Sequence, residues 1–192
     1  MSSVVKSSVN FLLFADDLKL YSALDLSESF KSTDLQNVLD DIYEWSCLWQ
    51  LTINTDKCTS LRLNSRPNNV TAPCYVVNGM PLSHVSNTRD LGVIVDSRLF
   101  YNNHIESICS KSMQRCGIFF RAFTCRNLPF LRKAFITYTR LLLEYSTIIW
   151  NPVLKKHIDS LEKIQRNFTK HIPSLKTLPY LERLRSLKLE TL

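Results

Sequence analysis

The chain has 192 residues, a hydrophobic content of 45% and a formal net charge of +7, so it is long and apolar enough to bury a core. Its charge is unevenly divided: residues 1–100 hold 8 Lys+Arg against 11 Asp+Glu, and residues 101–192 hold 16 against 6. The basic half favours a polyanionic partner, although a solvated basic helical surface would have the same composition. No apolar run is long enough to cross a bilayer, and the run before Asp16 lacks a cleavage site, which argues against membrane and secreted proteins.

The cysteines are scattered along the chain. They are Cys47, Cys58, Cys74, Cys109, Cys116 and Cys125. No CxxC pair and no histidine at metal-ligand spacing accompanies them. We therefore expect reduced core thiols of an intracellular protein.

The first predicted elements surround two adjacent carboxylates. Short apolar runs at residues 9–14 and 18–22 flank Ala15-Asp16-Asp17, a pattern typical of two strands joined by a tight turn. Neighbouring side chains of a straight strand point to opposite faces, so Asp16 and Asp17 can serve one site only if the chain turns there. The dipeptide alone is more typical of a solvated turn than of a metal site.

The remainder of the first half alternates between one helix and short strands. Apolar spacing over residues 33–49 predicts a helix. Residues 60–63 and 74–77 are typical of strands, and Asn78-Gly79 predicts a hairpin turn that leads into a run near Leu82. A further β-type stretch is expected at residues 91–95, with Gly92 inside it.

The second half is predicted to be helical, with four apolar stripes. The stripes are Ile105, Ile108, Cys109, Cys116, Phe119, Phe120 and Phe123; Leu131, Ala134, Phe135, Tyr138, Leu141, Leu142 and Tyr145; Ile158, Leu161, Ile164, Phe168 and Ile172; and Leu181, Leu184 and Leu187. The aromatic residues at helical spacing, including Trp45, Trp49 and Tyr138, are assigned to core packing and not to base stacking. The expected fold class is α+β, with an α+β region at residues 1–99 and a helical region at 100–192.

Seven ordered segments carry a family resemblance. They are FADDLKLYS at 14–22, EWSCLWQLTIN at 44–54, DKC at 56–58, NGMPL at 78–82, DLGVIVD at 90–96, LEYSTIIWNP at 143–152 and LEKIQRNFTKHIP at 161–173. Together they strongly resemble the reverse transcriptases of non-LTR retrotransposons, jockey-like elements in particular. The resemblance implies a partial polymerase palm followed by a thumb-like helical region.

The resemblance also implies roles for single residues. Asp16 would be the firmer Mg²⁺ (or Mn²⁺) ligand of the catalytic palm motif and Asp17 a supporting one. Lys57 would act as the general acid that protonates pyrophosphate. The alternative is that Lys57 is a surface lysine that follows a helix. Leu91 and Gly92 fall in the primer-grip motif, where glycine lets the backbone approach the primer end; the alternative is a glycine bulge in an edge strand.

The thumb would contact an RNA template and DNA primer duplex through basic side chains around the third stripe. These are Lys155, Lys156, Lys163, Arg166 and Lys170. They would position the duplex without reading its sequence, or simply form a solvated face.

The resemblance implies that the family's fingers, first palm aspartate and nucleotide-selecting segment lie upstream of FADDLKLYS, so we expect none of them within these 192 residues. Two carboxylates alone do not hold two ions, so we expect metal and dNTP to be engaged only when an upstream polymerase segment completes the palm. We also expect the first half to expose a sheet edge and an apolar patch, and to be the less stable half. The alternatives are a non-catalytic nucleic-acid-binding module and a degenerate element remnant; nuclear residence is implied by family likeness.

Overall fold

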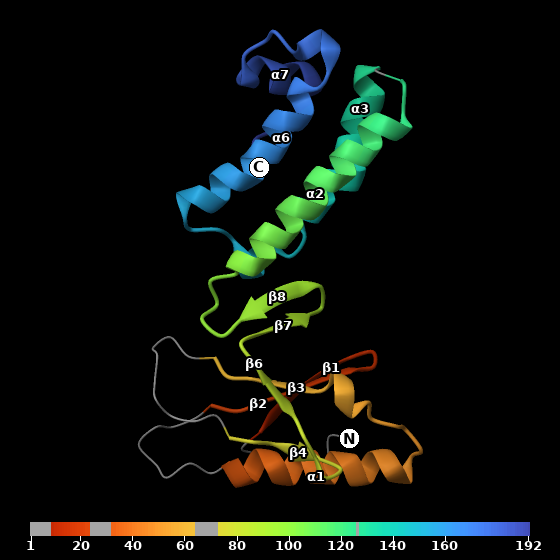
Figure 1. The fold of residues 1–192 in the computed structure, drawn as a ribbon, viewed down its shortest axis with the longest axis vertical. Coiled ribbons are helices and arrows are strands. Elements are labelled where there is room, and N and C mark those ends of the chain that lie inside the picture. The colour runs from red at the N-terminus through yellow and green to blue at the C-terminus, as the bar shows by residue number, and fades with distance from the viewer. Residues whose placement is uncertain (1–8, 24–31, 64–72, 126) are drawn as a thin grey trace. The chain divides into compact units, whose positions relative to one another are not determined.

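The computed structural model describes residues 9–23, 32–63, 73–125 and 127–192. The chain divides into two compact units, an N-terminal unit, Met1–Thr88, and a C-terminal unit, Arg89–Leu192 (Figure 1). Strands lie mainly in the first unit and helices in the second, which confirms the α+β fold class. The boundary between the units falls between Thr88 and Arg89, whereas the sequence pattern changes from strands to helices near residue 100. The two positions differ because strand β8 (Val93–Asp96) packs on a helix of the second unit and so belongs to that unit.

The N-terminal unit begins with the predicted hairpin. Strand β1, Asn10–Phe14, pairs antiparallel with β2, Asp17–Tyr21, and Phe14 lies opposite Asp17. The turn is Ala15-Asp16, and Ala15 has a φ of 53°. Because the chain reverses within two residues, Asp17 is the first residue of the return strand.

A helix and a second hairpin follow. Helix α1, Ser32–Leu48, lies against β4, Val76–Val77, and the Gln36 amide both donates to the Val76 carbonyl (2.7 Å) and accepts from the Val76 N–H (2.9 Å). Asn78 (φ 52°) and Gly79 (φ 70°) then connect β4 to β5, Met80–Pro81. Positive φ at both turn residues is the requirement of the type I′ turn, so the predicted hairpin is confirmed.

The last pair of the unit is parallel. Strand β3, Thr59–Leu61, follows the short 3₁₀ helix η1, Thr55–Lys57, and pairs with β6, Ser83–Val85.

The unit has a small core and much exposed apolar surface. Val9, Val38 and Ile42 are buried together, with Leu18, Leu20, Leu35 and Ile53 packed against them. The exposed large apolar side chains are Leu12, Leu13, Phe14, Tyr21, Leu48, Trp49, Leu51, Leu63 and Met80. The expected apolar exposure is therefore confirmed. The assignment of Trp49 to the core is wrong, because Trp49 follows the last residue of α1 and is exposed.

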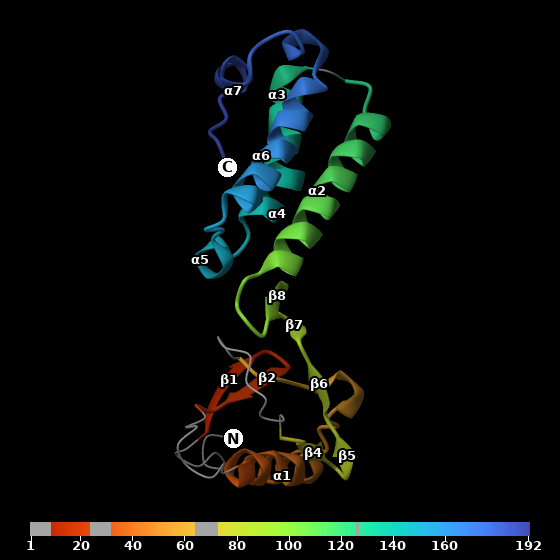
Figure 2. The same cartoon turned by 60° about the vertical axis from the view of Figure 1, so that its left-hand side comes forward.

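The C-terminal unit combines one hairpin with a helical assembly. The strands are β7, Asn87–Asp90, which begins just before the boundary, and β8; the helical elements are α2 Asn102–Ala122, α3 Leu128–Phe135, η2 Ile136–Arg140, α4 Leu141–Glu144, α5 Thr147–Trp150, α6 Lys155–Lys170, η3 Pro173–Leu175 and α7 Tyr180–Leu187. Figure 2 shows α2 beside α6, and the two helices are in contact. The Asp96 carboxylate accepts from the amides of Arg98, Phe100 and Tyr101 and so fixes the turn into α2.

The core of this unit is one continuous apolar cluster that includes several packed aromatic rings. Phe168 of α6 lies with its ring centroid 4.5 Å from that of Phe135 and 5.0 Å from that of Phe120. Phe119 of α2 is also buried and packs against Phe168, at 6.2 Å. The core roles predicted for Phe119 and Phe120 are thus confirmed, and they join α2, α3 and α6.

The second predicted stripe is only partly correct. Its helix is interrupted by η2, a π-helical segment, and the buried residues beyond Phe135 are Thr139 and Leu143. Tyr138 and Leu141 are 60% and 61% exposed. A π-helical turn holds more residues than an α-helical turn. The buried residues Phe135, Thr139 and Leu143 therefore follow one another at intervals of four, and a stripe predicted from the α-helical period of 3.6 residues places Tyr138 and Leu141 on the wrong face.

Two further expectations concern cysteines and membranes. All six cysteines lie in the described ranges and none forms a disulfide, but only Cys116 is buried, and Cys47, Cys74 and Cys125 are exposed, so the core assignment is wrong for these three. Within the described ranges, no helix combines the length and apolar character needed to cross a bilayer.

Candidate nucleic-acid and metal sites

The paired aspartates lie at the exposed tip of the β1–β2 hairpin. Asp16 is in the turn and Asp17 begins β2; both are exposed. Carboxylate oxygens suit Mg²⁺, which is usually bound by one or two carboxylates together with waters and substrate phosphates. In the part of the chain that the structure describes, no group of three or more His, Cys, Asp and Glu side chains is placed to hold a metal ion. The pair therefore offers part of a ligand set.

Lys57 ends η1 and is exposed. The element is fixed locally: the Asn54 side chain accepts from the Asp56 amide (3.1 Å), and the Asn54 carbonyl accepts from the Lys57 amide (3.2 Å). Among the described residues the Lys57 side chain makes no hydrogen bond or ion pair with Asp16 or Asp17. Its proposed proton-donor role therefore stays a prediction.

Leu91 and Gly92 form the two-residue turn between β7 and β8. Their φ values are 45° and 91°, so they reverse the chain. The β-type stretch expected at residues 91–95 is therefore confirmed for 93–95, which lie in β8, whereas Leu91 and Gly92 form a turn and not a strand or a bulge. The hydroxyl of Tyr145 donates to the Leu91 carbonyl (3.0 Å). A Cβ on Gly92 would lie 3.4 Å from Cε1 of the same tyrosine. That distance is an ordinary van der Waals contact, so glycine is favoured here by the positive φ of the turn and not by the approach of Tyr145.

Tyr145 is a residue that sequence reasoning placed wrongly. The apolar stripe assigned it to the core, but it follows α4, is half exposed, and holds the β7–β8 turn. Its backbone carbonyl also accepts from Trp150 Nε1 (2.8 Å). No local pattern identifies such a residue, because its partners are 54 positions earlier and 5 positions later in the chain.

His104 connects the hairpin to the helices. It is buried on α2, its Nδ1 accepts from the Ile94 amide of β8 (3.2 Å), and its ring lies edge-to-face with Trp150 at 5.1 Å. Burial lowers the pKa of His104 below its ordinary value, and the nearby positive charges of Arg89 and Lys111 lower it further. The neutral ring is therefore the form that the folded unit prefers.

The free energy of unfolding of the C-terminal unit is expected to fall as the pH falls from about 7 to about 5. The lowered pKa of His104 means that the unfolded state binds more protons than the folded state in this window, so protonation favours unfolding. Urea unfolding followed by circular dichroism measures the change. His104→Asn retains an acceptor for the Ile94 amide but does not titrate, and should weaken the pH dependence. His84→Asn, at an exposed position of the N-terminal unit, should leave it unchanged; equal pH profiles for both variants would exclude His104 as the cause.

The five basic residues predicted for nucleic-acid contact share one face of α6. At 3.6 residues per turn, Lys155, Lys156, Lys163, Arg166 and Lys170 fall within an arc of roughly 100°. All five are exposed, whereas the opposite face buries Leu161, Ile164 and Phe168. Asp159 is the single acid within the arc. The cationic residues are therefore concentrated on one side of the helix.

The five residues are not equivalent. The Arg166 guanidinium carbon lies 4.8 Å from the ring centroid of Tyr180, so Arg166 also helps to hold α7 against α6. The four lysines have no ion-pair partner among the described residues. They are free to meet an external anion.

The sequence of this chain is similar to those of several RNA-directed DNA polymerases of mobile elements. The chain is 29% identical over 109 residues, 56% of its length, to the RNA-directed DNA polymerase from mobile element jockey of Drosophila funebris, and 27% identical over 110 residues to that of Drosophila melanogaster. It is 23% identical over 166 residues, 83% of its length, to the probable RNA-directed DNA polymerase from transposon X-element of Drosophila melanogaster.

These relatives are much longer than the chain. The matches cover 12% of each jockey polymerase and 18% of the X-element polymerase. No protein-family model and no solved structure matches the chain. The predicted resemblance of this chain to the reverse transcriptases of jockey-like non-LTR retrotransposons is thereby confirmed.

Proposed function

We propose that this chain acts as part of an RNA-directed DNA polymerase and binds the duplex of RNA template and DNA primer. The similarity to the jockey and X-element polymerases carries the proposal. The one-sided basic face of α6 supports the binding role, because phosphate contacts need clustered cations without carboxylate partners.

The chemistry proposed for the N-terminal unit depends on Asp16 and Asp17. When Mg²⁺ or Mn²⁺ is bound, it would neutralise charge on the transferring phosphoryl group. Asp16 and Asp17 would hold the ion, and the exposed hairpin tip leaves room for dNTP phosphates and for ligands from the rest of a polymerase. Lys57 would donate a proton to the departing pyrophosphate.

A non-catalytic nucleic-acid-binding module is the second candidate. It requires only the basic face of α6, which is present in the C-terminal unit whatever completes the palm. The two candidates agree on duplex binding and differ on the need for Asp16.

Neutralising the four lysines of this face is expected to weaken binding of the 192-residue chain to a short RNA–DNA duplex. Each lysine that contacts a phosphate contributes about one unit to the slope of log K against log salt concentration. The variant with Lys155, Lys156, Lys163 and Lys170 changed to Gln should lose up to about four units of slope. Fluorescence anisotropy between 50 and 200 mM salt, roughly the range where such effects are large, measures both affinity and slope.

The matched control removes the same charge elsewhere. Arg98, Arg121, Lys133 and Lys176 are exposed and lie outside α6. Changing these four to Gln should alter the affinity much less than changing the α6 lysines. Equal losses would show that net charge alone attracts the duplex, and absent or salt-insensitive binding would remove the proposal.

A further inference from the structure

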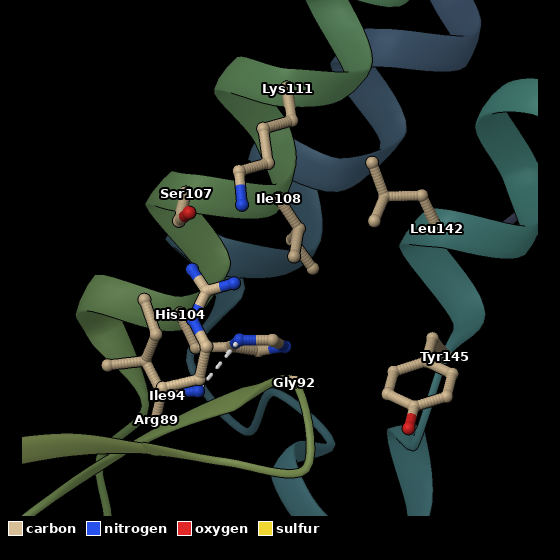
Figure 3. A pocket seen from close by; sticks show the side chains of 9 residues that line it. All are labelled: Arg89, Gly92, Ile94, His104, Ser107, Ile108, Lys111, Leu142 and Tyr145. Atoms are coloured by element: carbon tan, nitrogen blue, oxygen red, sulfur yellow. Dashed lines mark hydrogen bonds between the residues drawn. The ribbon is translucent and has the colours of Figure 1, made fainter. Parts of the chain in front are cut away.

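The C-terminal unit contains a cavity of about 210 Å³ between the β7–β8 hairpin, α2 and α4. Its polar lining is Arg89, His104, Ser107 and Lys111, and its remaining walls include Gly92, Leu142 and Tyr145 (Figure 3). We propose that this cavity binds a phosphate group through Arg89, Lys111, Ser107 and Nε2 of His104. None of these residues belongs to the basic face of α6, so the site goes beyond the binding surface proposed above.

The hydrogen bonding of His104 determines what it can bind. Its Nδ1 accepts from the Ile94 amide, so the proton of the neutral ring is on Nε2. His104 is only 3% exposed, and Nε2 has no hydrogen-bond partner in the structure. Figure 3 shows this nitrogen on the side of the ring away from Ile94, facing the space bounded by Tyr145 and Leu142. A buried donor without an acceptor is unfavourable, so a ligand that supplies an acceptor would be stabilised there.

The cavity offers donors and positive charge. The positive charges of Arg89 and Lys111 are close enough to lower the pKa of His104, and both side chains line the same cavity as its ring (Figure 3). Among the described residues neither cation has a carboxylate within ion-pair distance, and the Ser107 hydroxyl has no hydrogen-bond partner. No carboxylate lines the cavity. This arrangement favours an oxyanion and disfavours a metal cation.

The neighbouring Trp150 does not replace such a ligand. Its ring lies edge-to-face with His104 at 5.1 Å, and a ring is a much weaker acceptor than a phosphate oxygen. The volume corresponds to several waters, at about 30 Å³ each, and is below the roughly 300 Å³ at which pockets for drug-sized ligands begin. The cavity therefore suits a phosphate group and not a whole nucleotide. The group can come from free phosphate or from a nucleic-acid backbone.

Titration of the full chain with sodium phosphate, at an ionic strength held constant with sodium chloride, tests the site. The NMR signals of the His104 ring, assigned by their loss in His104→Asn, should shift saturably with phosphate. The double variant Arg89→Gln/Lys111→Gln should bind phosphate at least tenfold more weakly, because both charges are lost. Both residues are exposed overall, so the variant should remain folded. Arg98→Gln/Lys133→Gln removes the same charge and should leave the titration unchanged.

Two results would overturn the proposal: a His104 response no different from that to chloride, or equal weakening in the two double variants. A binding experiment with the RNA–DNA duplex identifies the source of the phosphate group. If the backbone supplies it, Arg89→Gln/Lys111→Gln weakens duplex binding and free phosphate competes; if free phosphate is the ligand, duplex binding is unchanged while phosphate affinity falls. Since the titration uses no nucleic acid, its outcome is separate from failure of the proposed polymerase function.

Discussion

Replacing Asp16 with asparagine is expected to lower primer extension at least about 100-fold in a chimeric polymerase in which this chain replaces the similar segment of the Drosophila funebris jockey polymerase. Asparagine preserves the size of the side chain and removes its negative charge, so the change affects metal binding more than folding. Metal-ion catalysis contributes several kcal/mol, and each 1.36 kcal/mol is about tenfold in rate. Extension of a labelled primer on an RNA template with Mg²⁺ measures the loss.

The comparison variants separate chemistry from general damage. Asp17→Asn should have a smaller effect, because Asp17 is the supporting ligand in the proposed site. Glu44→Gln removes a carboxylate from an exposed position of α1 and should leave extension unchanged. Extension by Asp16→Asn within threefold of the unsubstituted chimera would remove the proposed metal role and favour the non-catalytic binding module.

Replacing Trp150 with alanine is expected to destabilise the C-terminal unit by about 3 to 5 kcal/mol. Trp150 is 1% exposed, its ring packs against His104, and its Nε1 donates to the Tyr145 carbonyl. The substitution leaves a large cavity and an unpaired backbone acceptor at the point where α5 meets α2. Because domains have total stabilities of about 5 to 15 kcal/mol, the loss should be visible as a lower urea midpoint in circular dichroism at 222 nm.

Ile148 provides the matched control in the same short helix. It is 99% exposed, so Ile148→Ala should change the free energy of unfolding by no more than about 0.5 kcal/mol. A comparable loss in both variants would mean that helix α5 itself, and not the burial of Trp150, is being disturbed.

Local sequence signals predicted most of the secondary structure. The β1–β2 turn, the Asn78-Gly79 hairpin and helices α1, α2, α6 and α7 all follow from periodicity or from turn residues close together in the chain. The one-sided basic face of α6 also follows from spacing alone, because residues on one helix keep a fixed angular relation. These features depend on contacts of short sequence separation.

The residues around the β7–β8 turn could not be predicted in this way. The cavity brings together Arg89, His104 and Tyr145, which lie on β7, on α2 and after α4. Tyr145 is apolar enough to count as a core residue in a helical stripe, and only the tertiary structure shows that its hydroxyl reaches Leu91. His104 has no sequence pattern that distinguishes a packed histidine from a ligand-binding one. The predicted role of the turn itself at a primer end stays a prediction.

The π-helical segment η2 has a consequence for comparing this chain with its relatives. Ile136–Arg140 accommodates one residue more than regular α-helical turns would over the same rise, so every position from Leu141 onward is displaced in phase. A relative whose corresponding helix is uninterrupted would match this one only if a single-residue gap were placed within that segment. Without the gap, an alignment would pair the buried residues Thr139 and Leu143 with solvent-exposed positions of the relative. Core residues that are equivalent in the two proteins would then be scored as polar-for-apolar substitutions.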